Sequence, residues 1–393
     1  MLRHLIILCL LAYPLSALSN LLEITVVTSQ EEDRSNAGKS FAGITVQTHR
    51  PVDRAIELAV LESSALLNTV GIQAKIHRLE LNPDTDLTKQ LMQAPSNSLF
   101  ILDIPLQITE TVARIANDLN LISVNVRHSD VHLRESLCLP RLFHTIPSDR
   151  MYFDALGQFL IYRNWRKVLL IQGPEPRDST RAQILTQSLK KFGATVVDQR
   201  TFTLSHFPDD RDKNKPEFLT GGASYDVVAV IDSAKDYGRY LQYSTRRARP
   251  VVGDVGLSPT SWHYALERYG APQLNERYRN FLKNEPLEAR AAMTDAEFAA
   301  WSAVKLITNS INSRQKGEDL DLLSILHDSA SQVDLYKGTR GSIRHWNNQL
   351  RQPILLSTQD AVVAIAPMPK FLHPRHYVDT LGIDEPESTC QLR

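Results

Sequence analysis

The stretch from His144 to Ile171 constrains the fold more than any other part of the chain. It starts with a short extended segment, continues through Ser148, which is placed to cap a helix behind Pro147, and ends in the apolar run 168–171. Between them, apolar residues recur at spacings of three and four, namely Tyr152, Ala155, Leu156, Phe159 and Leu160. A strand with so little polar alternation is best explained by helices on both faces of a parallel sheet. The sequence therefore predicts an α/β lobe that begins at this crossing.

Strand and helix patterns alternate on both sides of the crossing. Before it, we predict strands over 22–27, 72–81, 98–102 and 121–126, with helices over 51–71, 84–93 and 108–119. After it, we predict strands over 168–171, 195–202, 226–231 and 251–253, with helices over 179–192 and 235–243. Late helices over 291–310 and 320–326 precede late strands over 354–356 and 361–365. This order predicts an α/β protein with two doubly wound parallel-sheet lobes.

The length of 393 residues also favours two lobes over one core. Because the late helices and strands follow both lobes, we expect the chain to cross between the lobes more than once. Lobe 1 is expected to comprise 20–145 plus about 265–335, and lobe 2 about 146–264 plus about 336–368, with 369–393 as a C-terminal tail. A hinge of several crossings would leave a cleft between the lobes.

The first 19 residues have the pattern of a secretory signal peptide. Arg3 precedes the apolar core 5–12, and Ala17-Leu18-Ser19 is a small-residue cleavage pattern. A membrane anchor is disfavoured because the apolar run is shorter than the roughly twenty residues that span a bilayer. Cys9 lies inside the apolar core, behind Leu8, where a lipid-attachment site would need a small residue. We therefore expect cleavage and export to the periplasm.

The charge balance and the cysteines narrow the classes of partner. Lys plus Arg and Asp plus Glu each total 44, so the overall charge does not attract nucleic acid or an anionic membrane. After signal removal Cys138 and Cys390 remain, and an even pair in an oxidising compartment suggests a disulfide. The alternative is one buried thiol and one exposed thiol in the tail. We expect a monomer.

Candidate ligand contacts come from the rule that open parallel sheets bind ligands beyond the carboxyl ends of their strands. The residues at these positions are Asp103, Asn125, Arg127, Gly173, Asp232 and Asp254. The alternative for each polar residue is a helix cap or a turn former, since Asp and Asn favour both. Trp262 and His263 could line the cleft, but packing at the hinge is the favoured interpretation.

Metal and enzyme sites are disfavoured by the patterns present. His128, Asp130 and His132 alternate, and acidic residues occupy 31–33, but neither segment has a complete ligand spacing. The chain has no GxSxG, HExxH, P-loop or dinucleotide-binding motif. We expect no metal, no cofactor and no catalysis.

The whole mature chain resembles a type I periplasmic substrate-binding protein of an ABC importer, of the branched-chain amino-acid class. It is most similar to the subfamily associated with pyrroloquinoline-quinone (PQQ)-dependent alcohol dehydrogenase systems. Besides 144–171, the resemblance lies in SPTSWH (258–263), YGAPQLNERY (269–278), KGTRGSIRHWNNQLRQPILL (337–356), FLH (371–373), DTLG (379–382) and PESTC (386–390). Both Cys138 and Cys390 are at cysteine-bearing positions of this subfamily.

The resemblance implies a receptor that closes two lobes on a small polar ligand and delivers it to an ABC permease in the inner membrane, where it touches membrane components only peripherally. Amino-acid receptors carry a Gly-rich loop with Ser or Thr after the first strand, whereas this chain has SQEEDRSNAGKS at 29–40. Asp103 and NVRH (125–128) also stand where such receptors have small hydroxyl residues. The resemblance therefore leaves the ligand open. The alternative function is a periplasmic sensor or accessory protein of the dehydrogenase system, which uses the same cleft without import.

Overall fold

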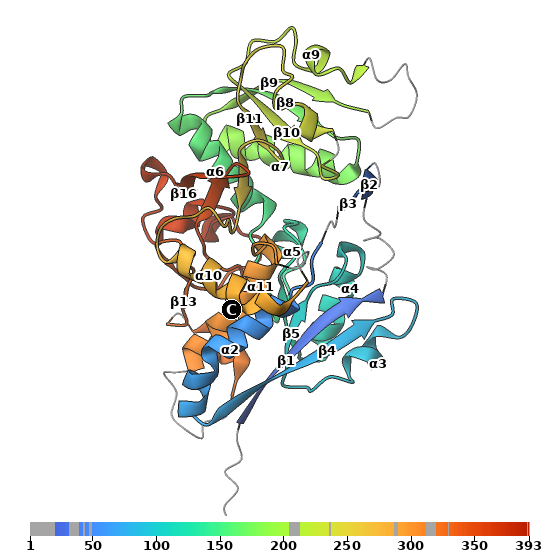
Figure 1. The fold of residues 1–393 in the computed structure, drawn as a ribbon, viewed down its shortest axis with the longest axis vertical. Coiled ribbons are helices and arrows are strands. Elements are labelled where there is room, and N and C mark those ends of the chain that lie inside the picture. Colours follow the sequence, from blue (N-terminus) through green and yellow to red (C-terminus); the bar gives the residue numbers. More distant parts are fainter. Residues whose placement is uncertain are drawn as a thin grey trace, which may run out of the picture.

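The computed structural model describes residues 20–30, 39–41, 44–46, 49–203, 213–235, 237–286, 290–311, 320–328, 330–390 and 392. The expected signal peptide and the acidic run 31–33 lie outside these residues. Two α/β lobes are stacked along the long axis of the molecule (Figure 1). Among the described residues, no helix has the length and apolar character needed to cross a membrane.

Lobe 1 is built on a parallel sheet of five strands in the order β4-β1-β5-β6-β7. The strands are β1 (Asn20–Ser29), β4 (Ile72–Leu81), β5 (Leu99–Leu102), β6 (Ile122–Asn125) and β7 (Leu142–His144). Its early helices are α2 (Asp53–Thr69), α3 (Leu87–Leu91), α4 (Leu106–Asp118) and α5 (His132–Glu135). A short hairpin, β2 (Lys39–Phe41) and β3 (Ile44–Val46), is separate from this sheet. The predicted strands are confirmed, except that β7 was not anticipated.

Both faces of the lobe 1 sheet are buried. Leu99 and Ile101 of β5 join a core with α2 and the late helices α10 (Ala271–Phe281), α11 (Asp295–Ile311) and α12 (Leu322–His327). Phe100 and Leu102 join a second core with α4 on the opposite face. Alternate residues of one apolar strand therefore serve two cores, which is why the strand has no polar side.

Lobe 2 is built on a parallel sheet of four strands in the order β11-β10-β8-β9. Its strands are β8 (Lys167–Gln172), β9 (Thr195–Thr201), β10 (Val227–Ile231) and β11 (Val251–Gly253), and its helices are α6 (Asp149–Tyr162), α7 (Pro176–Phe192) and α9 (Pro216–Leu219). Ser148 caps α6 by accepting a hydrogen bond from the Met151 N–H at 3.2 Å, as predicted. Val168 and Leu170 face α6 and α7, whereas Leu169 and Ile171 face the opposite core. The predicted α/β fold class is confirmed.

The helix predicted over 235–243 is wrong, because among the described residues of this range the only helical element is a 3-10 turn, Gly238–Tyr240. The carboxylate of Asp232 accepts a hydrogen bond from the Gly238 N–H at 2.8 Å. This side chain therefore takes the place of the backbone carbonyl that would accept from the same N–H in a helix. Tyr237 stacks on Phe202 with a centroid separation of 4.4 Å. The second face of this sheet is therefore covered by short turns and α9.

A third, antiparallel sheet lies beside α6 and contains β12 (Ser258–Thr260), β15 (Ile354–Ser357) and β16 (Val362–Ala366). A two-stranded ladder, β13 (Val333–Asp334) and β14 (Arg340–Gly341), precedes it in the chain. The segment after β14 lies against lobe 1, since the Leu350 N–H donates to the His144 carbonyl at 2.8 Å. We therefore place the third crossing near 351–353 instead of near 336. The division of the chain into lobes otherwise stays as proposed above.

Lys337 joins the three segments that cross between the lobes. This side chain is buried and donates to the carbonyls of Ser261 and Pro353 at 2.9 Å each and to the amide oxygen of Gln352 at 2.8 Å. The Gln352 amide in turn donates to the Thr145 carbonyl at 2.7 Å. Because Thr145 lies in the first crossing, Gln352 connects that crossing to Lys337. One lysine therefore holds the hinge segments together at a single point.

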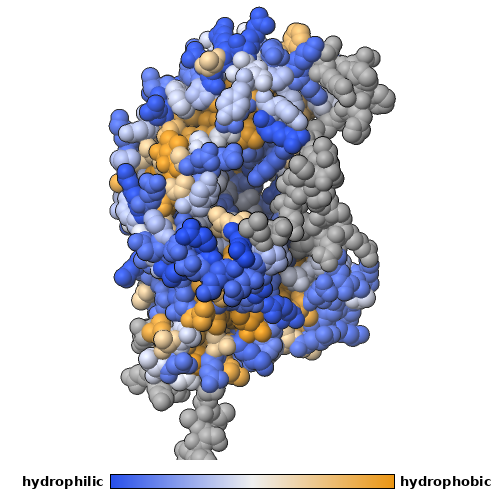
Figure 2. All heavy atoms as spheres, viewed as in Figure 1, coloured by the Kyte–Doolittle hydropathy of each residue, from blue (hydrophilic) through white to orange (hydrophobic). Residues whose placement is uncertain are grey.

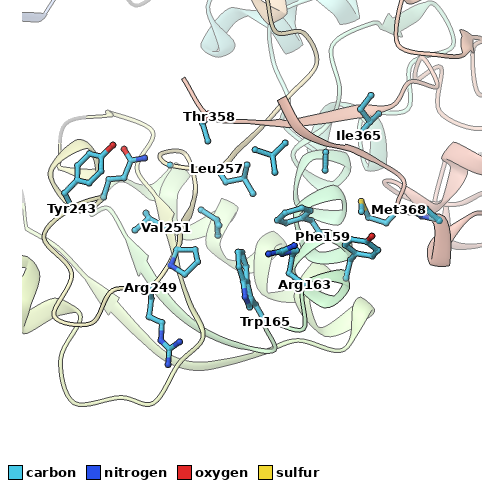
Figure 3. Close-up of a pocket in the computed structure, with 18 residues that line it drawn as sticks. Phe159, Arg163, Trp165, Tyr243, Arg249, Val251, Leu257, Thr358, Ile365 and Met368 are labelled. Atoms are coloured by element: carbon cyan, nitrogen blue, oxygen red, sulfur yellow. The ribbon is translucent and has the colours of Figure 1, made fainter. Parts of the chain in front are cut away.

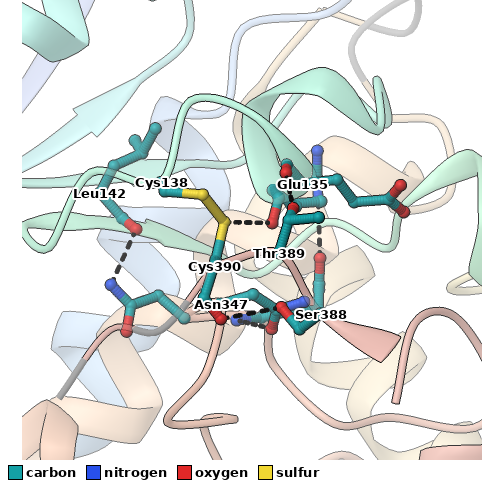
Figure 4. The surroundings of a disulfide bond; sticks show 10 residues. Glu135, Cys138, Leu142, Asn347, Ser388, Thr389 and Cys390 are labelled. Carbon is teal, nitrogen blue, oxygen red and sulfur yellow. Dashed lines mark hydrogen bonds between the residues drawn. A yellow bond between two sulfur atoms is a disulfide. The ribbon is translucent and has the colours of Figure 1, made fainter. Parts of the chain in front are cut away.

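The C-terminal tail runs from lobe 2 back to lobe 1, where a disulfide joins Cys138 to Cys390 (Figure 4). On the way, the buried Arg344 donates to the Asp379 carboxylate at 2.9 Å. The Thr389 hydroxyl donates to the Glu135 carbonyl next to the disulfide. The tail is thus held in its middle at Asp379 and near its end at Thr389 and Cys390.

Candidate functional site

The candidate site lies between the lobes, where Figure 2 shows a hollow with hydrophilic residues along its upper border. Side-chain contacts connect the loop after β6 in lobe 1 with the helices of lobe 2. Arg177 of α7 lies 3.3 Å from the Asp130 carboxylate, and the Ser129 hydroxyl donates to the Asp149 carboxylate at 2.9 Å. The loop at the carboxyl end of β6 in lobe 1 therefore contacts the N-terminal turns of α6 and α7 in lobe 2, and the rule for open sheets places ligands at such an edge.

Asp103 is the principal charged group that ends the strands of lobe 1. Its buried carboxylate accepts a hydrogen bond from the Val52 N–H, at the start of α2, at 3.2 Å. The same carboxylate lies 2.7 Å from His49 Nε2 and 3.7 Å from an Arg127 guanidinium nitrogen. Asp103 thus anchors the start of α2 and also lies close to the His49 and Arg127 side chains, which is the arrangement expected of either a cap or a ligand site.

Asn125 is fully buried, and its amide is used inside lobe 1. Its oxygen accepts from the backbone N–H groups of Arg127 and His128, and its nitrogen donates to the His128 carbonyl at 2.8 Å. Burial lowers the pKa of His128 to about 4, so the neutral ring donates to the Ile104 carbonyl at 2.6 Å. In this conformation Asn125 orders the loop that presents Arg127, and its contact with a ligand remains a prediction.

Arg181 and Asp254 form a two-point ion pair in lobe 2. Two guanidinium nitrogens of Arg181, in α7, lie 2.6 and 2.8 Å from the two Asp254 carboxylate oxygens, and a third nitrogen lies 3.2 Å from Asp149. Burial alone would raise the pKa of Asp254, but the guanidinium outweighs burial and lowers it. Asp254 also accepts from the Asp232 N–H at 2.8 Å, so this pair fixes the ends of β10 and β11 relative to α7.

Asp178 and Asp232 each keep one carboxylate oxygen that has no hydrogen-bond partner among the residues the structure describes. Their other oxygens accept from the Ser233 and Gly238 N–H groups, both at 2.8 Å. Burial first, and then the carboxylates of Asp178 and Asp254, raise the pKa of Asp232. Buried oxygens without partners are rare and costly, so this corner of lobe 2 is suited to hydrogen-bond donors or a positive group.

Gly173 makes room for this acidic corner. A Cβ atom at Gly173 would lie 2.1 Å from a carboxylate oxygen of Asp178. Only glycine therefore allows α7 to bring Asp178 so close to the end of β8. The role of Gly173 as a ligand contact stays a prediction, since this packing already accounts for the glycine.

The six predicted residues form two groups, with Asp103, Asn125 and Arg127 in lobe 1 and Gly173, Asp232 and Asp254 in lobe 2. Sequence reasoning missed Asp149, Asp178 and Arg181. The last two lie in the first turns of the helix after β8, and helix N-termini at the carboxyl edge of a sheet were a signal that could have found them.

The histidines and the aspartate of the segment 128–132, considered for metal binding, have other partners. His128 bonds to a backbone carbonyl, Asp130 pairs with Arg177, and His132 lies 3.0 Å from Glu110. Within the described part of the chain, no group of three or more His, Cys, Asp or Glu side chains is arranged to hold a metal ion. Trp262 packs in the core and stacks on Phe298 at 4.6 Å between centroids, in agreement with its expected packing role.

No family model matches the chain, and no curated protein matches its sequence. Solved structures do match its fold. A branched chain amino acid ABC transporter periplasmic ligand-binding protein from Burkholderia xenovorans has a TM-score of 0.68 and 11% identity, covering 94% of this chain and 99% of that chain. A solute binding protein of an ABC transporter from R. palustris, in complex with benzoate, has a TM-score of 0.58 and 12% identity, covering 88% and 96%.

A branched-chain amino acid transporter substrate binding protein from Streptococcus pneumoniae, in complex with isoleucine, has a TM-score of 0.56 and 14% identity, covering 87% of this chain and 98% of that chain. At such low identity these similarities define architecture alone. The chain has the fold of the type I periplasmic binding proteins.

Proposed function

We propose that this chain is a periplasmic solute-binding receptor, not an enzyme, that captures a small polar ligand between its lobes and presents the closed form to an ABC permease. The observation that carries the proposal is that charged side chains follow the carboxyl ends of strands in both parallel sheets, which is where open sheets bind ligands. Asp103 and Arg127 supply them in lobe 1, and Asp232 and Asp254 in lobe 2. The fold shared with ABC transporter binding proteins supports the same function.

The mechanism would be hinge closure. A ligand that contacts both lobes binds the closed form more tightly than the open form, so it shifts the population toward closure. The three crossings joined at Lys337 provide a compact pivot, and the Arg177–Asp130 pair is a further contact between the lobes. Closure would bring the acidic corner of lobe 2 toward the Arg127 guanidinium of lobe 1.

The ligand is proposed to have hydrogen-bond donors or a positive group at one end, because Asp178 and Asp232 have oxygens available in lobe 2. Isoleucine and benzoate are ligands of structural neighbours, and neither is assigned to this chain. The resemblance of segments such as 337–356 to the PQQ-associated subfamily supports a link to PQQ-dependent alcohol oxidation. We propose that link as the physiological context.

Native mass spectrometry of small molecules released from the purified protein would identify the ligand. Adding the released compound to ligand-free protein should raise the melting temperature and reduce the radius of gyration. Loss of its uptake in cells that lack the protein would support the importer role. Tight binding with unchanged uptake would instead favour a sensor or accessory role, and no bound compound with no compaction would overturn the proposed function.

A further inference from the structure

A groove of about 760 Å³ lies on the flank of lobe 2, separate from the interlobe site (Figure 3). Its walls come from three parts of the chain, namely the end of α6 with the residues that follow it, β11 with its flanking loops, and β16. None of its lining residues is among the site residues described above. What binds here would therefore not compete directly for the ligand groups of the cleft.

The residues that line the groove have the composition of a protein-binding surface. Its large side chains are aromatic residues, a methionine and two arginines, namely Phe159, Tyr162, Trp165, Tyr243, Met368 and the pair Arg163 and Arg249. The described lining contains no Asp, Glu or Lys, although acidic and basic residues total 44 each in the chain. Enrichment in aromatic residues, Met and Arg with depletion of Lys, Asp and Glu distinguishes interface cores from other protein surface.

Exposure argues for a macromolecular occupant. Tyr243 is 91% exposed, Val363 53% and Tyr162 52%, so large apolar groups face solvent along the groove. Pockets for small molecules bury most of the ligand surface, and such open walls could not do so. A contiguous exposed apolar surface of this kind is typical of a site that a protein partner covers.

The charge of the groove indicates which charged groups its partner carries. The guanidinium groups of Arg163 and Arg249 make no hydrogen bond or ion pair with a described residue, and the Arg163 guanidinium lies 5.5 Å from the Trp165 ring centroid. Two guanidinium groups without a neighbouring carboxylate leave positive charge at the edge of an apolar surface. Carboxylates on a partner would complement this charge, in the bidentate geometry that arginine favours.

We propose that this groove binds a segment of a protein partner that places a large apolar side chain against Trp165 and Ile365 and an adjacent Asp or Glu against Arg163 and Arg249. The proposal does not depend on the function of the interlobe site. Its occupant is defined by chemistry, as an acidic segment with an apolar anchor.

A phage-displayed library of random linear peptides, selected on the full-length protein, tests the proposal. Selection should enrich peptides in which Asp or Glu adjoins a large apolar residue. A synthetic copy of an enriched peptide, followed by fluorescence anisotropy, should bind at least about tenfold more weakly to the Arg163→Glu and Tyr243→Ser variants. The exposed residues Arg268 and Leu61 lie outside the groove, so Arg268→Glu and Leu61→Ser should bind as the wild type does.

Melting temperatures would show that all four variants are folded. Enrichment of peptides without acidic residues, or equal affinity for the Arg163→Glu and Arg268→Glu variants, would overturn the proposal. It would also be overturned if the groove bound the apolar anion anilinonaphthalene sulfonate but selected no peptide, since the site would then be one for small molecules.

Discussion

Lys337 Nζ lies 2.8 Å from Gln352 Oε1, and through this contact the lysine and the glutamine together join all three crossings between the lobes. The lysine is fully buried and also lies 5.0 Å from the centroid of the Phe298 ring. All three buried acceptors receive their hydrogen bond from this one side chain, so its loss would leave each of them without that donor. The hinge is therefore the pivot of the proposed closure, and a substitution that removes these hydrogen bonds should lower the free energy of unfolding.

We predict that Lys337→Met lowers the free energy of unfolding by about 3 kcal/mol, because three buried acceptors lose their donor. Urea denaturation of the variant and the wild type would measure the difference. Lys283→Met is the matched control, since Lys283 is exposed and should tolerate the change within about 0.5 kcal/mol. Equal stability of the Lys337 variant and the wild type would show that the hinge does not rely on this lysine.

The same lysine should make stability depend on pH. Burial lowers the pKa of Lys337 to about 7, whereas an unfolded lysine has a pKa of about 10.4. Between these values the unfolded chain holds a proton that the folded protein does not, so the free energy of unfolding should rise with pH from about 7 to about 10. The rise should be smaller in Lys337→Met, as measured by urea denaturation across this range. Parallel curves for the two proteins would contradict the prediction.

Asp232→Asn should stabilise the ligand-free protein and weaken ligand binding. Burial, with the carboxylates of Asp178 and Asp254, raises the pKa of Asp232, so its stabilising contribution is present at low pH and is lost as pH rises through that raised pKa. Asparagine keeps the acceptor for the Gly238 N–H without the charge, and we expect a gain of about 1 kcal/mol at neutral pH. Thermal unfolding at acidic and neutral pH, with the exposed Asp118→Asn as control, checks this; a gain at acidic pH alone would refute it.

Asn125→Ala should act mainly on stability. Its amide oxygen and nitrogen hold the loop that carries Arg127 and His128, so we expect a loss of about 2 kcal/mol in the free energy of unfolding. Chemical denaturation measures it, with Asn117→Ala as control because Asn117 has no such side-chain contacts. If Asn125→Ala kept full stability and lost only ligand affinity, Asn125 would be a direct ligand contact instead.

Removal of the Cys138–Cys390 disulfide should destabilise the protein by at most about 5 kcal/mol, because the bond closes a loop with a sequence separation of 252 residues. The Cys138→Ser and Cys390→Ser variants should lose similar amounts, and the double variant no more than either one. Peptide mapping of exported protein without reductant provides the direct measurement. Two free thiols that can be alkylated would rule the bond out.

The order of strands and helices was predictable because each apolar strand and each amphipathic helix carries its own period in the sequence. The segment over 235–243 was the exception, since its backbone is satisfied by the Asp232 side chain in a turn that no periodicity encodes. The strand β7 was also missed, although β11, which is equally short, was predicted. Local patterns therefore predicted most of the long elements, with α10 as an exception, and only some of the short ones.

The sequence by itself determined the α/β class, the two lobes and the residues that end the strands, since these follow from periodicity and from the geometry of parallel sheets. Only the tertiary structure decided which side chains are already occupied and which keep free acceptors, as with Asn125 and Asp178. It also brought Lys337 to the three crossings and placed the arginines beside exposed aromatic residues in the flank groove. These relationships join residues that are distant in the chain, and hydrogen-bond partners and burial are properties of packing that no single segment encodes.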